Sequence, residues 1–226
     1  MSNTSRTEKT KKLVTVAMFC ALAYISAFVF RFKVSFLTFD VKDAVITMGA
    51  MFCGPIFAPV ISLIVAFLEM ITVSDTEIYG MIMNFLSSCA FSFTASLIYK
   101  KKRTLNGAIV ALFSGVVAMV AVMMAANLVI TPVYTGMPTP DVAAMIPTLL
   151  LPFNFTKAVL NMAIVLLLYK PISNALKRGG LIPGDAASYK FDKKSALTLA
   201  FGGVLLVLSL LVFIFYLRGD ITIFKR

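Results

Sequence analysis

Long runs of apolar residues, interrupted by short polar segments, dominate the chain. We predict seven helices from these runs: Leu13–Phe32, Val41–Cys53, Pro55–Val73, Glu77–Tyr99, Leu105–Tyr134, Leu149–Lys170 and Ser195–Leu217. Most of the runs approach or exceed the roughly 20 residues that a helix needs to cross a hydrocarbon layer. They do not alternate between polar and apolar positions as the strands of a membrane-spanning β-barrel do. The pattern therefore predicts an all-α integral membrane protein.

Two of the segments that connect these helices indicate how the helices are grouped into units. Cys53, Gly54 and Pro55 leave almost no loop between the second and third helices, which predicts a tight hairpin. The polar segment from Gly179 to Lys194 predicts a linker before the last helix. We therefore expect a cytoplasmic N-terminal segment (1–12), a six-helix membrane domain (13–176), a polar linker (177–194), and an additional transmembrane helix with its tail (195–226).

The composition agrees with a membrane protein and argues against several kinds of site. Of the 226 residues, 60% are hydrophobic and 14% are charged, and the mean hydropathy is +0.94. This leaves too little polar surface for a soluble domain. The chain has no histidine, so it lacks the Ser–His or Cys–His pair of many nucleophilic enzymes and a common zinc ligand. We expect no catalytic residue, no metal site and no cofactor.

Of the 21 basic residues, 14 gather near helix ends on one side of the predicted bundle, within segments 1–12, 100–103 and 170–194. The positive-inside rule then predicts a multi-pass protein of the cell membrane with a cytoplasmic N-terminus. This orientation places outside the residues Asp40, Lys42, Asp43, Asp75, Glu77 and Asp141. We attribute the net charge of +11 to anchoring against the anionic headgroups of the lipid bilayer, and expect no nucleic-acid partner.

Polar side chains inside the sixth predicted helix need a specific explanation. A lysine near the bilayer centre costs roughly 2.5–3.5 kcal/mol on insertion scales, so such a residue usually faces a cavity, a partner or a pathway. Asn154, Lys157 and Asn161 stand at i, i+3 and i+7 and share one helix face. The alternative is that a buried carboxylate such as Glu69 holds Lys157 for packing alone.

Asn84 and Asn127 add amides in the fourth and fifth helices. By the predicted orientation they lie in the outer halves of their helices, as Asn154 and Lys157 do, so the four could converge on a pocket open to the outside. Amides and one cation among Phe, Leu and Met suit a compact organic molecule with several hydrogen-bonding atoms. The chain has no GxxxxGK[ST] phosphate loop, so energy for transport would have to come from another subunit.

The first helix carries small residues at helical spacing. Ala17 and Ala21 are four apart, and so are Ala23 and Ala27. Such spacing lets helices approach closely. Contact within the bundle and contact with a partner protein are both open.

These features resemble a known family, the S-components of energy-coupling factor (ECF) vitamin transporters. The resemblance rests on six spans with an alanine-rich first helix, a short second helix and the basic "YKKKR" after the fourth. "ANLVITPVY" (126–134) and "PFNFTK" (152–157) are most similar to the riboflavin-binding members. The resemblance covers roughly residues 10–176. The seventh helix is a departure, because S-components usually end near Leu176.

The resemblance implies a fold, a function and partners. The fold would be a six-helix S-component bundle, here with an additional C-terminal transmembrane helix. It would bind riboflavin from outside and deliver it inward with a transmembrane coupling protein and two ATPase subunits. Carried over by position, Asn127, Asn154 and Lys157 would hydrogen-bond the flavin, Asp40 would add a contact, and Ala17 with Ala21 would form the coupling surface.

Three alternatives remain from the sequence. The scaffold could serve another vitamin, such as pantothenate or a thiamine precursor. The chain could be an intramembrane enzyme that uses Lys157 with Ser88. It could also be a structural or sensory membrane protein whose pocket stays empty.

Overall fold

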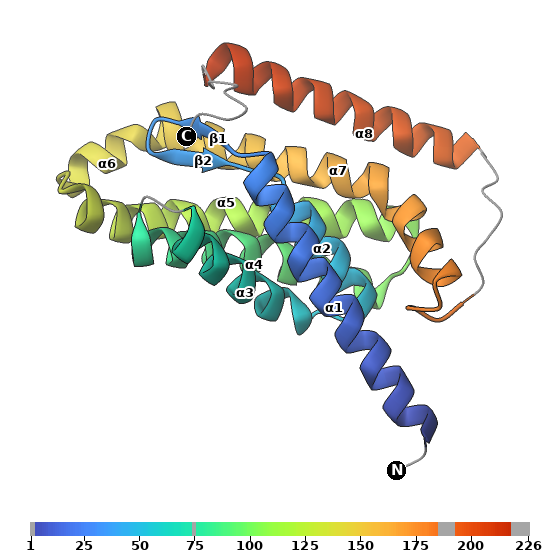
Figure 1. Cartoon of the computed structure of the whole chain (residues 1–226). Helices are drawn as coiled ribbons and strands as arrows, with labels where there is room; N and C mark the ends of the chain where they lie inside the picture. Colours follow the sequence, from blue (N-terminus) through green and yellow to red (C-terminus); the bar gives the residue numbers. More distant parts are fainter. Residues whose placement is uncertain (1–2, 74–75, 185–192, 218–226) are drawn as a thin grey trace.

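The computed structural model describes residues 3–73, 76–184 and 193–217. Most of them lie in helices that run roughly lengthwise through the molecule (Figure 1). The helices are α1 (Asn3–Val29), α2 (Lys42–Cys53), α3 (Phe57–Thr72), α4 (Glu77–Lys101), α5 (Leu105–Thr135), α6 (Thr139–Met145), α7 (Leu151–Arg178) and α8 (Lys193–Leu211). This arrangement confirms the predicted all-α class.

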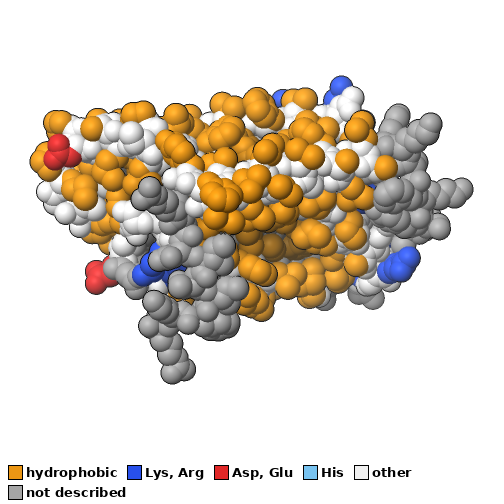
Figure 2. All heavy atoms as spheres, turned by 90° about the horizontal axis from the view of Figure 1, so that it is seen from above, with side chains coloured by type: hydrophobic (Ala, Val, Ile, Leu, Met, Phe, Trp, Pro, Cys, Tyr) orange, Lys and Arg blue, Asp and Glu red, His pale blue; other side chains and the backbone are white. Residues whose placement is uncertain are grey.

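Within the described residues, five helical segments are long and apolar enough to cross a membrane by length and composition: Thr7–Val29, Glu77–Lys101, Leu105–Thr135, Thr139–Arg178 and Ala196–Tyr216. The last corresponds to the additional C-terminal helix that the sequence predicts. Figure 2, seen from the α8 side, shows that apolar side chains make up much of this face. The acidic side chains in that view lie at the end of the bundle that holds α6 (Figures 1 and 2). We call this end the α6 end.

Helices α2 and α3 form the predicted hairpin, but at 12 and 16 residues both are shorter than a full span. Gly54 ends α2 with φ 116°, a conformation that a side chain would disfavour. Gly49, inside α2, lets the helices approach closely, because a Cβ there would lie 2.9 Å from Phe19 Cγ in α1 and 3.0 Å from Ile61 Cδ1 in α3.

Among the described residues, two strands replace the predicted end of the first helix and the short loop that follows it. β1 (Phe32–Val34) pairs antiparallel with β2 (Leu37–Phe39), and Phe32 faces Phe39 in the register. Three-residue strands are too short to give a clear alternating pattern, so the apolar run reads equally well as the end of a helix. The hairpin lies at the α6 end, over one end of α7 (Figure 1).

The sixth predicted helix begins earlier than expected. Helix α6 leads through one π-helical turn, η1 (Ile146–Leu150), directly into α7. Pro138 precedes α6 as its N-cap, and Gly136 closes α5 in the left-handed conformation at φ 72°. The short α6 was missed because its residues do not form a long apolar run.

The last helix packs along α7 and ends in a second π-helical turn, η2 (Val212–Tyr216). A Cβ on Gly202 would lie 3.1 Å from Leu167 Cγ, so the two backbones approach closely there. The buried apolar side chains of the described residues form two clusters. One fills the centre of the bundle around Phe19, Phe91 and Leu112, and the other lies at the α6 end around Phe39, Phe153 and Phe213.

Candidate functional site

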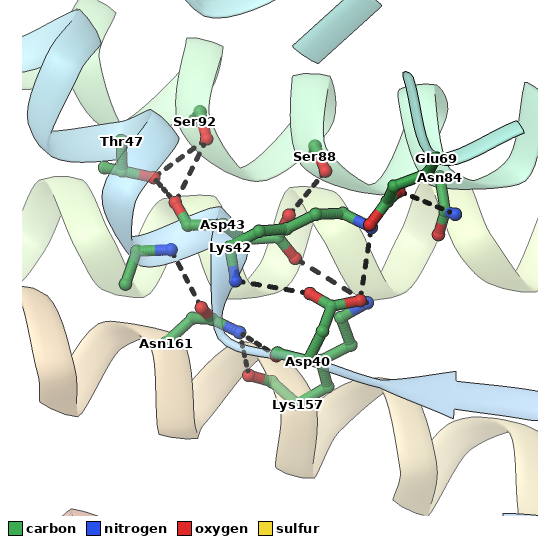
Figure 3. Close-up of polar contacts among 11 residues, drawn as sticks. Asp40, Lys42, Asp43, Thr47, Glu69, Asn84, Ser88, Ser92, Lys157 and Asn161 are labelled. Atoms are coloured by element: carbon green, nitrogen blue, oxygen red, sulfur yellow. Dashed lines mark hydrogen bonds and ion pairs between the residues drawn. The ribbon is translucent and has the colours of Figure 1, made fainter. Parts of the chain in front are cut away.

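Five charged side chains from three helices and the β2–α2 junction meet inside the bundle, all 6% exposed or less (Figure 3). They are Asp40, Lys42, Asp43, Glu69 and Lys157. Lys157 Nζ lies 2.9 Å from Asp40 Oδ2. Lys42 Nζ lies 2.7 Å from Glu69 Oε2 and 3.2 Å from Asp40 Oδ2. Buried charges are tolerated when they are paired and hydrogen-bonded, and these contacts meet that condition. We call these five residues the ionic network.

Asp43 is the least neutralised carboxylate of the ionic network. Ser88 donates a hydrogen bond from Oγ to Asp43 Oδ1, and the Nζ of Lys157 lies 3.9 Å from Oδ2. Within the described chain Asp43 Oδ2 accepts no hydrogen bond. Three carboxylates face two ammonium groups, so the network formally carries one excess negative charge.

Asn161 joins the start of α2 to α7. Its Oδ1 accepts the backbone N–H of Ala44 at 2.8 Å, and its Nδ2 donates to the carbonyls of Asp40 and Lys157. The first turn of a helix leaves N–H groups without intrahelical partners, and Val41, the N-cap of α2, makes no side-chain cap. Asn161 therefore supplies from α7 a hydrogen bond that α2 lacks, and fixes Asp40 beside Lys157.

A cavity of about 80 Å³ lies beside the network toward the α6 end. The residues lining it include Arg31 after α1, Phe36, Leu37 and Thr38 of the hairpin, Asn84 and Ser87 of α4, and Asn154 and Lys157 of α7. Among the described residues, Ser87 Oγ and Arg31 Nε are buried without a hydrogen-bond partner. Such atoms are costly unless something satisfies them, so they mark this cavity as a place for a polar ligand atom.

The structure brings three predicted site residues together at this cavity: Asn84, Asn154 and Lys157. Asp40 lies directly behind them as the partner of Lys157. Asn127 is placed differently. It is fully buried, donates to the Met123 carbonyl and accepts from Thr131 within α5. Its amide is occupied by its own helix, and the cavity-lining residues of α5 are Met123 and Tyr134. A ligand contact remains a prediction for each of these residues.

Two expectations from the sequence need correction. Asp40, Lys42 and Asp43 were counted among the polar residues on the outer side of the membrane, but all three are buried within the bundle. The predicted helix Val41–Cys53 already began within "DVKD" (40–43), and the fold adds that these charged residues are buried. The suggested packing partner of Lys157 was Glu69, whereas Asp40 holds Lys157, and Glu69 pairs with Lys42.

Sequence reasoning did not propose Lys42, Asp43 and Ser87 as parts of the site. One signal was available for Glu69, because an isolated carboxylate in an apolar helix requires a buried cation. Ser87 gives no such signal, since serines in membrane helices commonly bond their own backbone.

The arrangement does not match the enzyme alternative. That alternative needs Lys157 to activate Ser88, but Ser88 donates to Asp43 and Lys157 donates to Asp40. The site is suited instead to hold a molecule by hydrogen bonds from amides, a hydroxyl and an ammonium group.

A second surface concerns the small residues of α1. Ala17 and Ala21 are exposed, whereas Ala23 and Ala27 are buried inside the bundle. The two pairs of small residues therefore lie on different faces of α1. One packs within the chain, and the other leaves a shallow strip flanked by exposed Val14 and Ile25.

Comparisons with known proteins agree with this architecture. The family model "ECF transporter, substrate-specific component" matches residues 11–169. The riboflavin transporter RibU of Staphylococcus aureus (strain TCH60) is 30% identical over 182 residues, which cover 76% of this chain and 95% of that protein. A solved structure of the S component of a bacterial ECF transporter superposes with a TM-score of 0.65 at 28% identity. It covers 75% of this chain and 99% of the solved chain.

Proposed function

Because this chain belongs to the ECF transporter family as a substrate-specific component, we propose that its substrate is riboflavin. We further propose that it takes riboflavin from outside the cell and passes it inward with a transmembrane coupling protein and two ATPase subunits. Its multi-pass membrane character supports this role, and the cell membrane with a cytoplasmic N-terminus is the orientation that the basic segments favour.

The observation that carries the proposal is the set of polar atoms around the cavity. Riboflavin has a flat ring system whose pyrimidine edge alternates carbonyls with an N–H, and a chain of hydroxyl groups. Asn84 Nδ2 donates to Glu69 and Asn154 Nδ2 donates to the Leu150 carbonyl, so each amide keeps one N–H and its carbonyl oxygen for a ligand. Lys157 can donate further N–H groups, and Ser87 Oγ can donate or accept. The aromatic and aliphatic lining from Phe36, Leu37 and Phe153 suits the faces of the ring.

The cavity must enlarge to admit this ligand. Its volume of about 80 Å³ is below the roughly 300–1,000 Å³ of pockets that bury an organic molecule of such size. The β1–β2 hairpin forms one wall, through Phe36, Leu37 and Thr38. A two-stranded hairpin is the least self-stable part of the fold, so it is the wall that moves at least cost.

Direct binding tests the substrate. Purified full-length protein in detergent is expected to quench the fluorescence of added riboflavin and to gain melting temperature with it, but not with pantothenate or a thiamine precursor. A gain with one of the other vitamins alone would replace riboflavin as the substrate. No gain with any of the three would favour the structural or sensory alternative.

The exposed face of Ala17 and Ala21 supports a role in coupling. Small residues on a lipid-facing helix allow another helix to approach its backbone, and no helix within the described residues covers this strip. We assign this strip to the transmembrane coupling protein.

A further inference from the structure

Helix α8 and its π-helical turn η2 lie beyond the residues that match the family, which end at 169. From its start near the end of α7, α8 runs back along α7 to the α6 end, where it meets the β1–β2 hairpin (Figure 1). The element that distinguishes this chain therefore ends at a wall of the candidate site.

The contact between η2 and the hairpin is aromatic and buried. The ring of Phe213 lies 4.6 Å from that of Phe39 in β2 and 5.8 Å from that of Phe32 in β1, measured between centroids. Phe213 is 2% exposed. Leu217 is buried in the same cluster.

The same cluster continues into the site. Phe39 also meets Phe153 of α7 at 5.8 Å in an edge-to-face arrangement. Each of these two rings stands one residue before a polar residue of the site, since Asp40 follows Phe39 and Asn154 follows Phe153. Phe39 therefore contacts both Phe213 of η2 and Phe153 of α7, and it directly precedes Asp40, the partner of Lys157.

We propose that Phe213 is a positioning residue of the substrate site, which holds the β1–β2 hairpin closed over the cavity through its contact with Phe39. A hairpin of two three-residue strands has little stability of its own and depends on what covers its apolar face. Phe213 and Leu217 supply part of that cover. As far as it concerns substrate exchange, this role rests on the proposed function.

The test compares two phenylalanines of the same helical turn in the full-length protein. Phe213→Ala removes the ring that contacts the hairpin. Phe215→Ala removes a ring that is 76% exposed and serves as the matched control. Hydrogen–deuterium exchange of residues 32–39 is the first readout, because it needs no ligand. We expect exchange in Phe213→Ala to be faster by about tenfold or more, with α4 and α5 unchanged, and Phe215→Ala to match the parent protein.

The second readout is riboflavin exchange. In Phe213→Ala the dissociation rate is expected to rise several-fold, whereas Phe215→Ala keeps the parent rate. Unchanged hairpin exchange in Phe213→Ala, or equal acceleration in both variants, would overturn the positioning role. If Phe213→Ala speeds hydrogen–deuterium exchange of the hairpin but the protein binds no riboflavin, Phe213 still holds the hairpin in place, and only riboflavin as the substrate is refuted.

Discussion

At the scale of single residues, the ionic network explains why an apolar helix contains Lys157. The lysine is held by Asp40, from a segment 117 positions away in the sequence, and Asn161 fixes that segment through the carbonyl of Asp40 and the N–H of Ala44. Removing one member of a buried ion pair leaves an uncompensated charge, which is more costly than removing both.

This reasoning predicts the result of a pair of substitutions. Lys157→Met is expected to destabilise the protein by about 3–5 kcal/mol, because Asp40 loses one of its cations and Asp43 loses its nearest one. The double variant Lys157→Met/Asp40→Asn should recover a large part of that loss. Thermal unfolding of the purified protein measures both. A double variant as unstable as the single one would show that the loss comes from packing and not from charge.

Ser87 offers a test that separates stability from binding. In Ser87→Ala, an unpartnered buried hydroxyl is removed, so stability should stay equal or rise by up to about 1 kcal/mol. Riboflavin affinity should fall about 3- to 10-fold, as expected for one lost hydrogen bond. Ser62→Ala is the control, because Ser62 Oγ is also buried and unpartnered but lies outside the cavity lining. Equal effects on affinity in the two variants would exclude Ser87 as a ligand contact.

At the scale of elements, the long apolar helices were predictable and the short pieces around the site were not. Hydropathy finds α4 and α5 almost to the residue, because each is a lipid-spanning run with polar ends. It misses β1, β2 and α6, which have few residues and depend on tertiary packing for their stability. Asn154 and Lys157 were found because polar residues in the middle of a lipid-spanning helix are conspicuous. Lys42 and Asp43 stand at the start of the predicted helix Val41–Cys53, where charged residues are common, so their burial was not predicted.

Close packing between elements predicts opposite effects of one substitution at two glycines. Gly49→Ala should destabilise the protein by about 1–3 kcal/mol, since its Cβ would press on Phe19 and Ile61 in neighbouring helices. In Gly203→Ala the added Cβ in α8 meets no atom of the described chain within 4 Å, so the variant should be stabilised by roughly 0.5–1 kcal/mol through helix propensity. The melting temperatures of the two variants measure these effects. A lower melting temperature in both would show that α8 packs more tightly around Gly203 than described.

At the scale of the whole molecule, the faces of the bundle have different uses. Helix α8 of the chain itself covers the α7 face, while α1 exposes Ala17 and Ala21 on the surface of the bundle. This division supports the assignment of the α1 strip to the coupling protein.

Bulky residues on that strip should uncouple transport from binding. Ala17→Trp and Ala21→Trp are expected to retain riboflavin binding but to lose co-purification with the coupling protein and cellular uptake, because the larger side chain holds the two helices apart. Val110→Trp on α5, at a position 58% exposed, is the control and should behave as the parent protein. Normal uptake by both Ala17→Trp and Ala21→Trp would show that the interface with the coupling protein lies elsewhere.

The packing of α8 along α7 also limits the directions from which another protein can contact this chain. A membrane partner of a six-helix bundle without an additional helix could approach it from any direction in the plane of the membrane. Here one arc of the perimeter is already filled, and the close approach at Gly202 leaves no room for a second helix between α7 and α8. If the coupling protein binds the α1 strip as we propose, a complex containing this chain is asymmetric, because the α7 face is covered by α8 and the α1 face is open to the partner.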